Sequence, residues 1–423
     1  MNIKSDVILD RMMSLHPKII DLTLDRMWRL LAALGNPERH LPPVIHIAGT
    51  NGKGSTQAMI RAGLESSGNL VHAYTSPHLA RFHERIVLAG KVISEPYLTE
   101  ILAECEQANG DVTITYFEIT TCAAILAFSR TKADYTLLEV GLGGRLDATN
   151  IIEVPRLCII TPVSIDHTGY LGETIEEIAG EKAGILKRGV PCIVGPQTDA
   201  ALAVIEAEAT KTGARLLIHG QDWHVREENG RLVFQDESGL LDLPLPALIG
   251  AHQVQNAGAA IAALRVLGMD DAACEAAVSN AIWPARMQQL KAGPLVDAAG
   301  QAELWLDGGH NPAAGLAIAE ALGRLPKRPL FMICGMLNTK DIGGYLAPLA
   351  ALVEQLFAVS IDGEPATLSA EKTAGAAQAA GMDAVIAKDI LSAVEQIVNS
   401  TPNARILICG SLYLAGRVLQ ENR

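Results

Sequence analysis

Short apolar runs and helix-like stretches alternate along most of the chain. The run Val44–Ala48 is rich in β-branched residues, which predicts a buried strand, and Gln57–Ser67 has the composition of a helix. A glycine-rich loop lies between them. The same order of strand, loop and helix returns several times, so the pattern predicts an α/β fold with a mostly parallel sheet.

The pattern continues on both sides of an interruption near residue 290. Further strands are predicted at residues 71–75, 134–140, 157–161, 303–306, 330–334, 356–361 and 406–409, and helices at 19–34, 119–130, 174–187, 250–268 and 272–281. The helical run breaks at Trp283, and Lys291–Pro294 has the composition of a hinge. We therefore predict a larger domain at 1–290 and a smaller, Rossmann-like α/β domain at 291–423.

Composition limits the partners and the compartment. The chain has 423 residues, of which 49% are hydrophobic, so it can bury two cores. Only 4% are aromatic and the net charge is −13, which argues against nucleic acid or an anionic membrane as a partner. No uncharged span is long enough to cross a bilayer, and the seven cysteines lack a CxxC pair. These features predict a cytoplasmic protein.

The loop Gly49–Ser55, GTNGKGS, suits a nucleotide triphosphate. Glycines let backbone N–H groups turn toward an anion, the N-terminus of the next helix adds partial positive charge, and Lys53 supplies a full charge. The match to the standard phosphate loop is incomplete, because Ile47 replaces its first glycine and Gly54 replaces its hydroxyl residue. A glycine turn without function is the alternative interpretation.

Three polar residues stand at or just beyond the ends of separate predicted strands: Ser76, Glu139 and His167. Open α/β sheets bind ligands at the carboxyl ends of their strands, so we expect these side chains to converge beside the loop. Serine and glutamate oxygens suit Mg²⁺, whereas histidine does so less readily. From spacing alone, His167 is a general base or a core residue as readily as a metal ligand. For each of the three positions, the alternative interpretation is an ordinary surface residue.

Lys182 follows Glu181 in the predicted amphipathic helix 174–187. A helical lysine beside a glutamate typically belongs to a solvated face. The local pattern therefore predicts an exposed Lys182.

Eight motifs occur in the order found in a known family. They are GTNGKGS at 49–55, SPHL at 76–79, TYFE at 115–118, EVGLGGRLDATN at 139–150, DH at 166–167, EKAGI at 181–185, PARMQ at 284–288 and DGGHNP at 307–312. Together they resemble the folylpolyglutamate synthase and dihydrofolate synthase family, in particular its bacterial bifunctional members, which is itself similar to the Mur ligases. The resemblance covers nearly the whole chain, and the family shares the missing first glycine of the loop.

The resemblance implies a P-loop, Mur-ligase-like ATP-binding domain followed by a glutamate-ligase-type domain. It implies that ATP contacts Gly49, Thr50, Asn51, Gly52, Lys53, Gly54, Ser55, Asn256, Arg286 and Asp307. It implies two Mg²⁺ ions on Ser76, Glu139 and His167, with Lys182 carbamylated so that a negative group positions the second ion. The implied catalytic residues are Lys53, Lys182, His167 and, in a supporting role, His310. The candidate cofactors also include a monovalent cation such as K⁺.

The resemblance also implies the substrates. The pterin side would contact Thr115, Tyr116, Phe117, Glu118, Gly144, Arg145, Leu146 and Asp147. Phe117 would stack on a flat ring or is merely a core residue, and Arg145 would meet a carboxylate. ATP would activate a substrate carboxylate as an acyl phosphate, which the amine of L-glutamate attacks. The acceptor would be dihydropteroate, a reduced folate or both, and the enzyme is expected to be a monomer.

Other functions stay open at this point. The enzyme could be a folylpolyglutamate synthase only, or the chain could be a nucleotide-dependent switch or binding protein without ligase chemistry. A Mur-type ligase acting on a UDP-sugar peptide is disfavoured, because those proteins carry a further domain before the loop and 48 residues precede Gly49 here.

Overall fold

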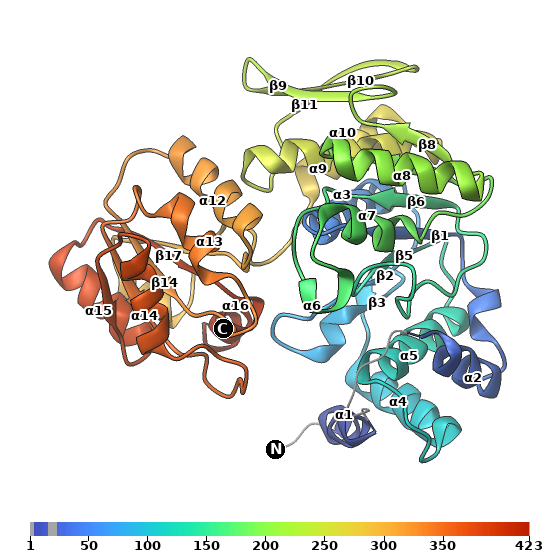
Figure 1. The fold of residues 1–423 in the computed structure, drawn as a ribbon, viewed down its shortest axis with the longest axis horizontal. Helices are drawn as coiled ribbons and strands as arrows, with labels where there is room; N and C mark the ends of the chain where they lie inside the picture. Colours follow the sequence, from blue (N-terminus) through green and yellow to red (C-terminus); the bar gives the residue numbers. More distant parts are fainter. Residues whose placement is uncertain (1–3, 16–22, 423) are drawn as a thin grey trace. The chain divides into compact units, whose positions relative to one another are not determined.

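A computed structural model describes residues 4–15 and 23–422 of the chain, which form two compact units (Figure 1). The first unit contains the described residues up to His78, together with His83–Ala247 and Val254–Ala281. The second contains Leu79–Phe82, Leu248–Gln253 and the described residues from Ile282 onward. Each unit is built around its own sheet, which confirms the predicted α/β fold class.

Strands and helices alternate through the first part of the chain. The strands are β1 (Val44–Ala48), β2 (Val71–Tyr74), β3 (Ile86–Leu88), β4 (Lys91–Val92), β5 (Tyr135–Glu139), β6 (Leu157–Ile160), β7 (Pro191–Val194), β8 (Arg215–Ile218), β9 (His224–Glu228), β10 (Arg231–Asp236) and β11 (Gly239–Pro244). The helices are α1 (Lys4–Ser14), α2 (Asp25–Ala33), α3 (Lys53–Ser66), α4 (Glu95–Asn109), α5 (Tyr116–Arg130), α6 (Thr168–Leu171), α7 (Ile175–Ala183), α8 (Asp199–Thr212), α9 (Ala251–Val266) and α10 (Asp271–Asn280), with short 3-10 helices at Pro37–His40 and Phe82–Arg85.

The main sheet of the first unit brings the predicted strand ends to one edge. Its order among the described residues is β4-β3-β2-β5-β1-β6-β7-β8. The strands β2, β5, β1, β6, β7 and β8 pair in parallel, whereas β3 pairs antiparallel with both β2 and β4. In register, Ile47 of β1 lies beside Glu139 of β5, and Tyr74 of β2 lies beside Leu138. The phosphate loop, Ser76 and Glu139 therefore leave the sheet at its carboxyl edge.

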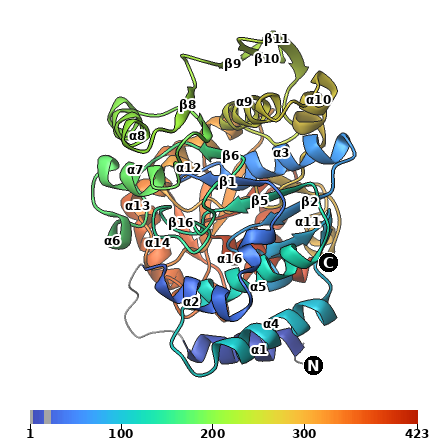
Figure 2. The ribbon, with the colours of Figure 1, turned by 90° about the vertical axis from the view of Figure 1, so that its right-hand side faces the viewer.

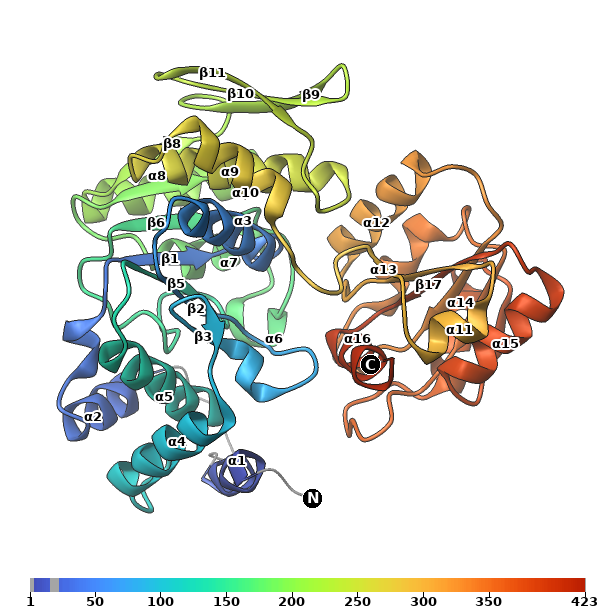
Figure 3. The ribbon, with the colours of Figure 1, turned by 180° about the vertical axis from the view of Figure 1, so that it is seen from behind.

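Helices cover both faces of this sheet. Ala48, Cys158 and Cys192 share one buried cluster with Ile178 of α7 and Ile205 of α8. On the other face α3 contacts β1, β2 and β5, and α10 packs on α3. Figure 2 shows α7 and α8 on one side of the strands and α3, α9 and α10 on the other, and Figure 3 shows α3 from behind. Strands enclosed in this way are buried on both faces, which explains their nearly continuous apolar runs.

A small antiparallel sheet, in the order β11-β10-β9, follows β8. Its attachment to α9 depends on Trp223, whose side chain is buried and whose indole N–H donates to the Leu217 carbonyl. A Cβ at Gly258 of α9 would collide with Val225 and Trp223, so the missing side chain lets the sheet lie close against the helix.

The second unit is a six-stranded sheet between two helical layers. Its strands are β12 (Gln288–Leu290), β13 (Glu303–Leu306), β14 (Leu330–Cys334), β15 (Gln355–Ala358), β16 (Ala384–Ile386) and β17 (Arg405–Cys409), in the order β12-β13-β17-β14-β15-β16. Its helices are α11 (Pro294–Ala299), α12 (Pro312–Arg324), α13 (Ile342–Leu346), α14 (Ala370–Ala379), α15 (Ile390–Ser400) and α16 (Leu412–Glu421), with a 3-10 turn at Ala347–Leu349. Strand β12 pairs antiparallel with β13, and the other strand pairs of this sheet among the described residues are parallel.

Alternate residues of each central strand enter different cores. Ile406 and Ile408 belong to the cluster that includes α11, α15 and α16, whereas Leu407 belongs to the cluster that includes α12, α13 and α14. This alternation follows from the two-residue period of a strand. It explains why the apolar run ILIC at 406–409, which follows Arg405, forms a central strand.

The predicted elements differ from the structure mainly at their ends. Helix α3 begins at Lys53 rather than at residue 57, and α7 ends at Ala183 rather than at 187, before Gly184. Of the predicted helix 19–34, residues 19–22 lie outside the described residues, and α2 begins at Asp25. Strand β12 lies before the predicted boundary at 290 but pairs in the second sheet. None of the helices within 4–15 and 23–422 has the length and apolar character that a membrane crossing needs.

A buried ion pair joins α2 to α5. Arg26 contacts Glu118 through two hydrogen bonds of 2.8 and 2.9 Å, and the exposed fractions of the two side chains are 16% and 8%. Glu118 also accepts from the Thr115 backbone N–H, while Thr115 Oγ1 accepts from the Glu118 N–H. This capping box fixes the start of α5.

We expect Arg26→Ala to lower the free energy of unfolding by about 3–5 kcal/mol, because the Glu118 carboxylate would stay buried without its partner. Urea unfolding followed by circular dichroism measures the change. Arg130→Ala is the matched control, since the Arg130–Glu104 pair is about 40% exposed on both sides and should contribute about 1 kcal/mol or less. Equal losses in the two variants would contradict the assigned role of Arg26.

Candidate active site

The phosphate loop depends on two glycines with positive φ. Gly49 has φ +144° and Gly52 has φ +90°. A Cβ at Gly49 would collide with the Thr161 hydroxyl, and one at Gly52 would collide with the Asn256 side chain. Asn256 of α9 therefore lies against the loop, at the position predicted for a nucleotide contact. Only glycine satisfies both the backbone conformation and the space at these two positions.

The loop is also tied to the segment that follows β6. The Thr50 N–H donates to the Pro162 carbonyl at 3.0 Å. The Thr50 hydroxyl donates to the Ser164 carbonyl and accepts from the Ser164 N–H, each at 3.0 Å. These bonds connect the phosphate loop directly to the chain that leads to Asp166 and His167.

Two lysines meet at one backbone carbonyl. The Lys53 ammonium donates to Gly49 O at 3.1 Å and to Thr50 O at 3.2 Å. The Lys182 ammonium donates to the same Gly49 O at 3.0 Å. Lys182 is only 4% exposed, so its prediction as a solvated surface lysine is wrong. The local helix pattern failed because the loop from another strand covers this face of α7.

Burial changes the protonation of Lys182. Desolvation and the nearby Lys53 cation lower its pKa from 10.5 to about 7, although Asp166, Asp147 and Glu181 oppose the change. A large fraction of the amine is therefore neutral at neutral pH. A neutral, buried amine can act as a nucleophile, which an ordinary ammonium cannot.

Ser76 and Glu139 lie together at the carboxyl edge of the sheet. The Ser76 N–H donates to a Glu139 carboxylate oxygen at 3.4 Å, and Glu139 is 6% exposed. The Ser76 hydroxyl oxygen is buried and has no hydrogen-bond partner among the described residues. Hydroxyl and carboxylate oxygens are the hard ligands that Mg²⁺ prefers, so the chemistry of this pair fits the predicted metal.

The remaining predicted ligand, His167, has a different environment. It begins α6 with φ +53°, its side chain is 45% exposed, and its backbone N–H donates to the Asp166 carboxylate at 2.8 Å. Within the described chain, no group of three or more His, Cys, Asp and Glu side chains is arranged to hold a metal ion. Mg²⁺ commonly completes its shell with water and phosphate oxygens, so two or three protein ligands are sufficient.

The residues predicted to hold the pterin ring divide into two groups. Thr115 and Glu118 are engaged in the capping box and the Arg26 ion pair described above. Phe117 is half-buried, and a Cβ at Gly141 would collide with its ring, so the ring lies over the start of the loop that follows β5. Tyr116 is also half-buried, and burial raises its pKa to about 12.

The loop 141–150 is organised by Asp147. Its carboxylate accepts from the N–H groups of Gly141 and Leu142, and from the N–H and hydroxyl of Thr149. Burial raises the pKa of Asp147, and these four hydrogen bonds oppose the rise. The side chain is 4% exposed and shapes the loop from inside. In contrast, Arg145 is 62% exposed and forms an ion pair with Glu181.

The same loop is fastened to α7. The Arg145 N–H donates to the Glu181 carbonyl at 2.8 Å, and the Asn150 amide donates to the Gly184 carbonyl at 3.1 Å. A Cβ at Gly144 would lie 2.7 Å from the Glu181 carbonyl oxygen, so this glycine permits the close approach. The predicted residue Leu146 is half-buried in the same loop. Sequence reasoning could not foresee that this loop helps to position Lys182.

The second unit has its own strand-end site. Asp307 follows β13, is 5% exposed, and accepts from the N–H groups of Met287 and Gly309 at 2.7 and 2.6 Å. Burial raises the pKa of Asp307, and the Arg286 guanidinium opposes the rise. Arg286 stands between two residues with positive φ, Ala285 at +55° and Met287 at +42°. Such strained backbone is typical of functional sites.

His310 belongs to the loop after β13. Its Nδ1 lies 2.9 Å from the Gly308 carbonyl oxygen, so Nδ1 carries the hydrogen. This bond fixes the tautomer and leaves Nε2 as the acceptor of the neutral ring.

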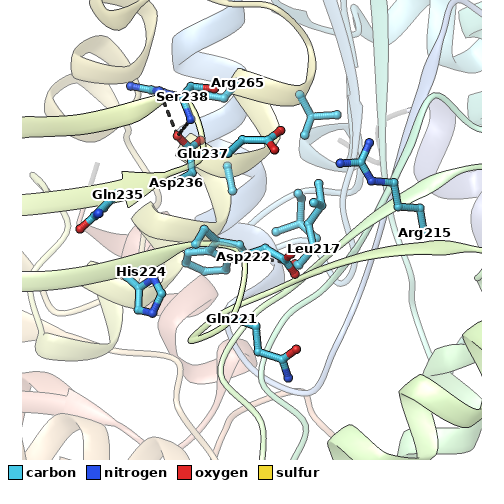
Figure 4. Close-up of a pocket in the computed structure, with 14 residues that line it drawn as sticks. Arg215, Leu217, Gln221, Asp222, His224, Gln235, Asp236, Glu237, Ser238 and Arg265 are labelled. Carbon is cyan, nitrogen blue, oxygen red and sulfur yellow. Dashed lines mark hydrogen bonds and ion pairs between the residues drawn. The ribbon is translucent and has the colours of Figure 1, made fainter.

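A separate cavity of about 440 Å³ lies between β8, β10 and α9 of the first unit. Figure 4 shows its lining, in which Asp236 pairs with Arg265 at 3.1 Å while Arg215 and Glu237 stand at other positions of the wall. None of the candidate residues from the sequence is among the described lining residues. This cavity is therefore separate from the predicted site.

This chain is similar to known proteins over nearly its whole length. Residues 47–264 match the Mur ligase middle domain, and residues 286–412 match the Mur ligase glutamate ligase domain. The dihydrofolate synthase/folylpolyglutamate synthase of Escherichia coli is 34% identical over 412 residues, which cover 96% of this chain and 93% of that protein. The chain belongs to this family. The folylpolyglutamate synthase of Lacticaseibacillus casei is 33% identical over 93% of each chain.

Solved structures of the family share the fold. The E. coli enzyme in complex with DHPP and ADP has a TM-score of 0.89 at 33% identity, covering 98% of this chain and 97% of that one. The bifunctional enzyme of Yersinia pestis, complexed with AMPPNP and a Mn ion, has a TM-score of 0.87 at 31% identity, with 98% and 97% covered. The protein is thus an ATP-dependent ligase, and a switch protein without ligase chemistry is not supported.

We expect Gly49→Ala to weaken the binding of ADP at least about tenfold, because a side chain at φ +144° would collide with Thr161 and force the loop to move. Isothermal titration calorimetry measures the affinity. Gly68→Ala is the matched control: Gly68 follows the other end of α3 with φ +81° and open space around it. That variant should lose about 1–2 kcal/mol of stability and keep its nucleotide affinity. Unchanged binding by Gly49→Ala would contradict the role of the loop.

Proposed function

We propose that this ligase adds L-glutamate to dihydropteroate and to reduced folates, using ATP and releasing ADP and phosphate. The observation that carries the proposal is the position of Lys53 and the buried Lys182 on the Gly49 carbonyl, at the sheet edge that also holds Ser76 and Glu139. The similarity of the whole chain to an enzyme solved with DHPP and ADP, and to one solved with Mn, AMPPNP and L-glutamate, supports these substrates.

The reaction requires activation of a carboxylate. A free carboxylate is a poor electrophile, because its carbon would have to expel an oxide or hydroxide. Attack of the substrate carboxylate oxygen on the γ-phosphorus of ATP releases ADP and forms an acyl phosphate. The neutral amine of glutamate then attacks the acyl carbon, phosphate leaves, and the amine proton passes to solvent or to a base. Both steps depend on orientation and charge neutralisation rather than on a protein nucleophile.

The loop residues Gly49 to Ser55 would surround the phosphates. The Lys53 ammonium would exchange its hydrogen bonds to the Gly49 and Thr50 carbonyls for contacts that neutralise phosphoryl oxygens. Bound Mg²⁺ would supply further positive charge to the triphosphate. Ser76 and Glu139 would hold one ion, and His167 would ligate the second. We further propose Asn256, Arg286 and Asp307 as nucleotide contacts, and a supporting catalytic role for His310.

Lys182 has the properties of a carbamylation site. Its amine is buried and has a pKa near 7, so it can add to CO₂, form a C–N bond and lose a proton to give a carbamate. The modified side chain would carry a negative charge. It could then accept hydrogen bonds or ligate the second Mg²⁺ ion, which the ammonium form repels.

The substrate contacts follow from which side chains are exposed. Tyr116, Phe117, Arg145 and Leu146 would contact the pterin or the carboxylate of the substrate, with Gly144 lining the loop. Thr115, Glu118 and Asp147 would shape this site rather than touch the ligand, because their polar atoms are engaged within the protein. A K⁺ ion, a monomeric state and a cytoplasmic location stay predictions.

A paired assay tests the function directly. We expect the wild-type protein to release ADP only when ATP, Mg²⁺, L-glutamate and an acceptor are all present, with both dihydropteroate and tetrahydrofolate as acceptors. Lys53→Ala should lower kcat by at least about a hundredfold, because one positive charge on the phosphates is lost, without loss of the fold by circular dichroism. Glutamate-independent ADP release would contradict the ligase assignment, and activity of Lys53→Ala within a few-fold of wild type would remove the lysine from the mechanism.

Lys182 gives a second test. We expect Lys182→Ala to lose activity and to regain part of it in the presence of small carboxylates such as acetate, which could occupy the place of the carbamate. Since the neutral amine is required, ¹³C-bicarbonate should give a carbamate signal in NMR spectra of the wild-type protein that grows as the pH rises through about 7. Full activity of the alanine variant, or a protein without any carbamate signal, would show that Lys182 stays an amine.

A further inference from the structure

A histidine interrupts the otherwise apolar strand β1. His46 is completely buried in the centre of the first sheet, between Ile45 and Ile47 in the sequence and beside Leu138 and Cys158 in register. Its Nε2 lies 2.8 Å from the Thr149 hydroxyl oxygen. None of the motifs that carry the family resemblance includes this residue.

The directions of the hydrogen bonds are fixed by the hydroxyl. The Thr149 O–H donates to Asp147 Oδ1 at 2.5 Å, and a hydroxyl has a single hydrogen to donate. It must therefore accept from His46, whose Nε2 carries the hydrogen. Burial and the Lys187 cation lower the pKa of His46 to about 3, which keeps the ring neutral in this tautomer. The result is a directed chain from His46 through Thr149 to the Asp147 carboxylate.

This chain of hydrogen bonds ends on backbone N–H groups beside a predicted metal ligand. The other oxygen of Asp147 accepts from the N–H groups of Gly141 and Leu142 at 3.1 and 2.8 Å. These residues directly follow Glu139 and Val140, and the Val140 N–H donates to the carbonyl of Ile47 in β1. Two sets of hydrogen bonds therefore hold the polypeptide after Glu139 against β1. One runs from His46 through Thr149 and Asp147, and the other is the bond from Val140 to Ile47.

The burial of His46 has a free-energy cost, and apolar packing alone does not explain why it is tolerated. Its Nδ1 is buried and has no hydrogen-bond partner among the described residues. An isoleucine or valine, as at the neighbouring positions of β1, would avoid this cost. An unsatisfied buried group in a folded protein calls for a compensating role, and the only other polar atom of the ring donates to Thr149.

We propose that His46 is a positioning residue of the ligase: through Thr149 and Asp147 it holds the chain that follows Glu139, and thereby the carboxylate that binds the divalent metal with the nucleotide. The inference rests on the proposed function in taking Glu139 as a metal ligand. Residues behind metal ligands commonly change metal affinity strongly when they are replaced.

The test measures metal binding rather than turnover. We expect His46→Leu to weaken the binding of Mn²⁺ in the presence of AMPPNP about tenfold or more, measured as free Mn²⁺ by electron paramagnetic resonance. His46→Gln places an amide N–H near the position of Nε2–H and should restore most of the affinity. The Mg²⁺ concentration that half-activates ATP turnover should shift in parallel for the leucine variant.

His72→Leu is the matched control. His72 is also completely buried in the same sheet, four residues before Ser76, but its ring bonds to the Thr131 carbonyl and the Ala89 N–H, outside the predicted site. It should lower the melting temperature without changing Mn²⁺ affinity. Equal loss of affinity in the two leucine variants, or unchanged affinity in His46→Leu, would overturn the proposal.

Thr149 tests the middle of the chain if His46→Leu fails to fold. Thr149→Val removes the hydroxyl that links His46 to Asp147 and should weaken Mn²⁺ binding. Thr149→Ser keeps the hydroxyl and should bind Mn²⁺ nearly as tightly as the wild type. The same affinity in both variants would overturn the proposal. Where His46→Leu folds, the double variant with Thr149→Val should bind Mn²⁺ no more weakly than the weaker-binding single variant. Both substitutions break the same chain of hydrogen bonds. Failure of the wild type to form glutamate-dependent ADP would count against the proposed function instead.

Discussion

The arrangement of the predicted site in the first unit depends on the carbonyl oxygen of Gly49. Lys53, at the start of α3, and Lys182, on α7, both donate to it, although they come from elements on opposite faces of the sheet. Two ammonium groups at one acceptor repel each other, and burial adds to this repulsion, so one of them is readily neutral. Burial and the Lys53 cation lower the pKa of Lys182 to about 7.

Close packing against two glycines makes this arrangement possible. Gly49 lies against Thr161, and Gly144 lies against the Glu181 carbonyl. Each contact leaves no room for a Cβ. The glycines thus bring the loop after β1 and the loop after β5 close to their neighbours, and hydrogen bonds from Thr50 and Asn150 then hold them there. Rigid placement of this kind suits phosphoryl transfer, in which orientation and fixed charge supply most of the catalysis.

Residues that resemble ligand contacts in the sequence divide by burial. Glu118 and Asp147 are carboxylates inside motifs that the family shares, yet one fixes α2 to α5 and the other shapes a loop. Arg145 and Phe117, from the same motifs, present a charge and a ring that are partly accessible. A motif therefore marks a place in the fold, and the direction of each side chain decides whether it meets a substrate or supports the neighbours that do.

The sequence by itself determined the α/β class, the positions of the main strands along the chain and the glycine-rich loop, because these follow from local periodicity and from backbone chemistry within a few residues. It also placed Ser76 and Glu139 at strand ends. Only the tertiary structure decided that Lys182 is buried and that His46 is part of a hydrogen-bonded chain. The hydrogen-bond partner of each, Gly49 for Lys182 and Thr149 for His46, lies more than a hundred residues away in the sequence. Hydrogen bonding at that range depends on packing, which no local pattern encodes.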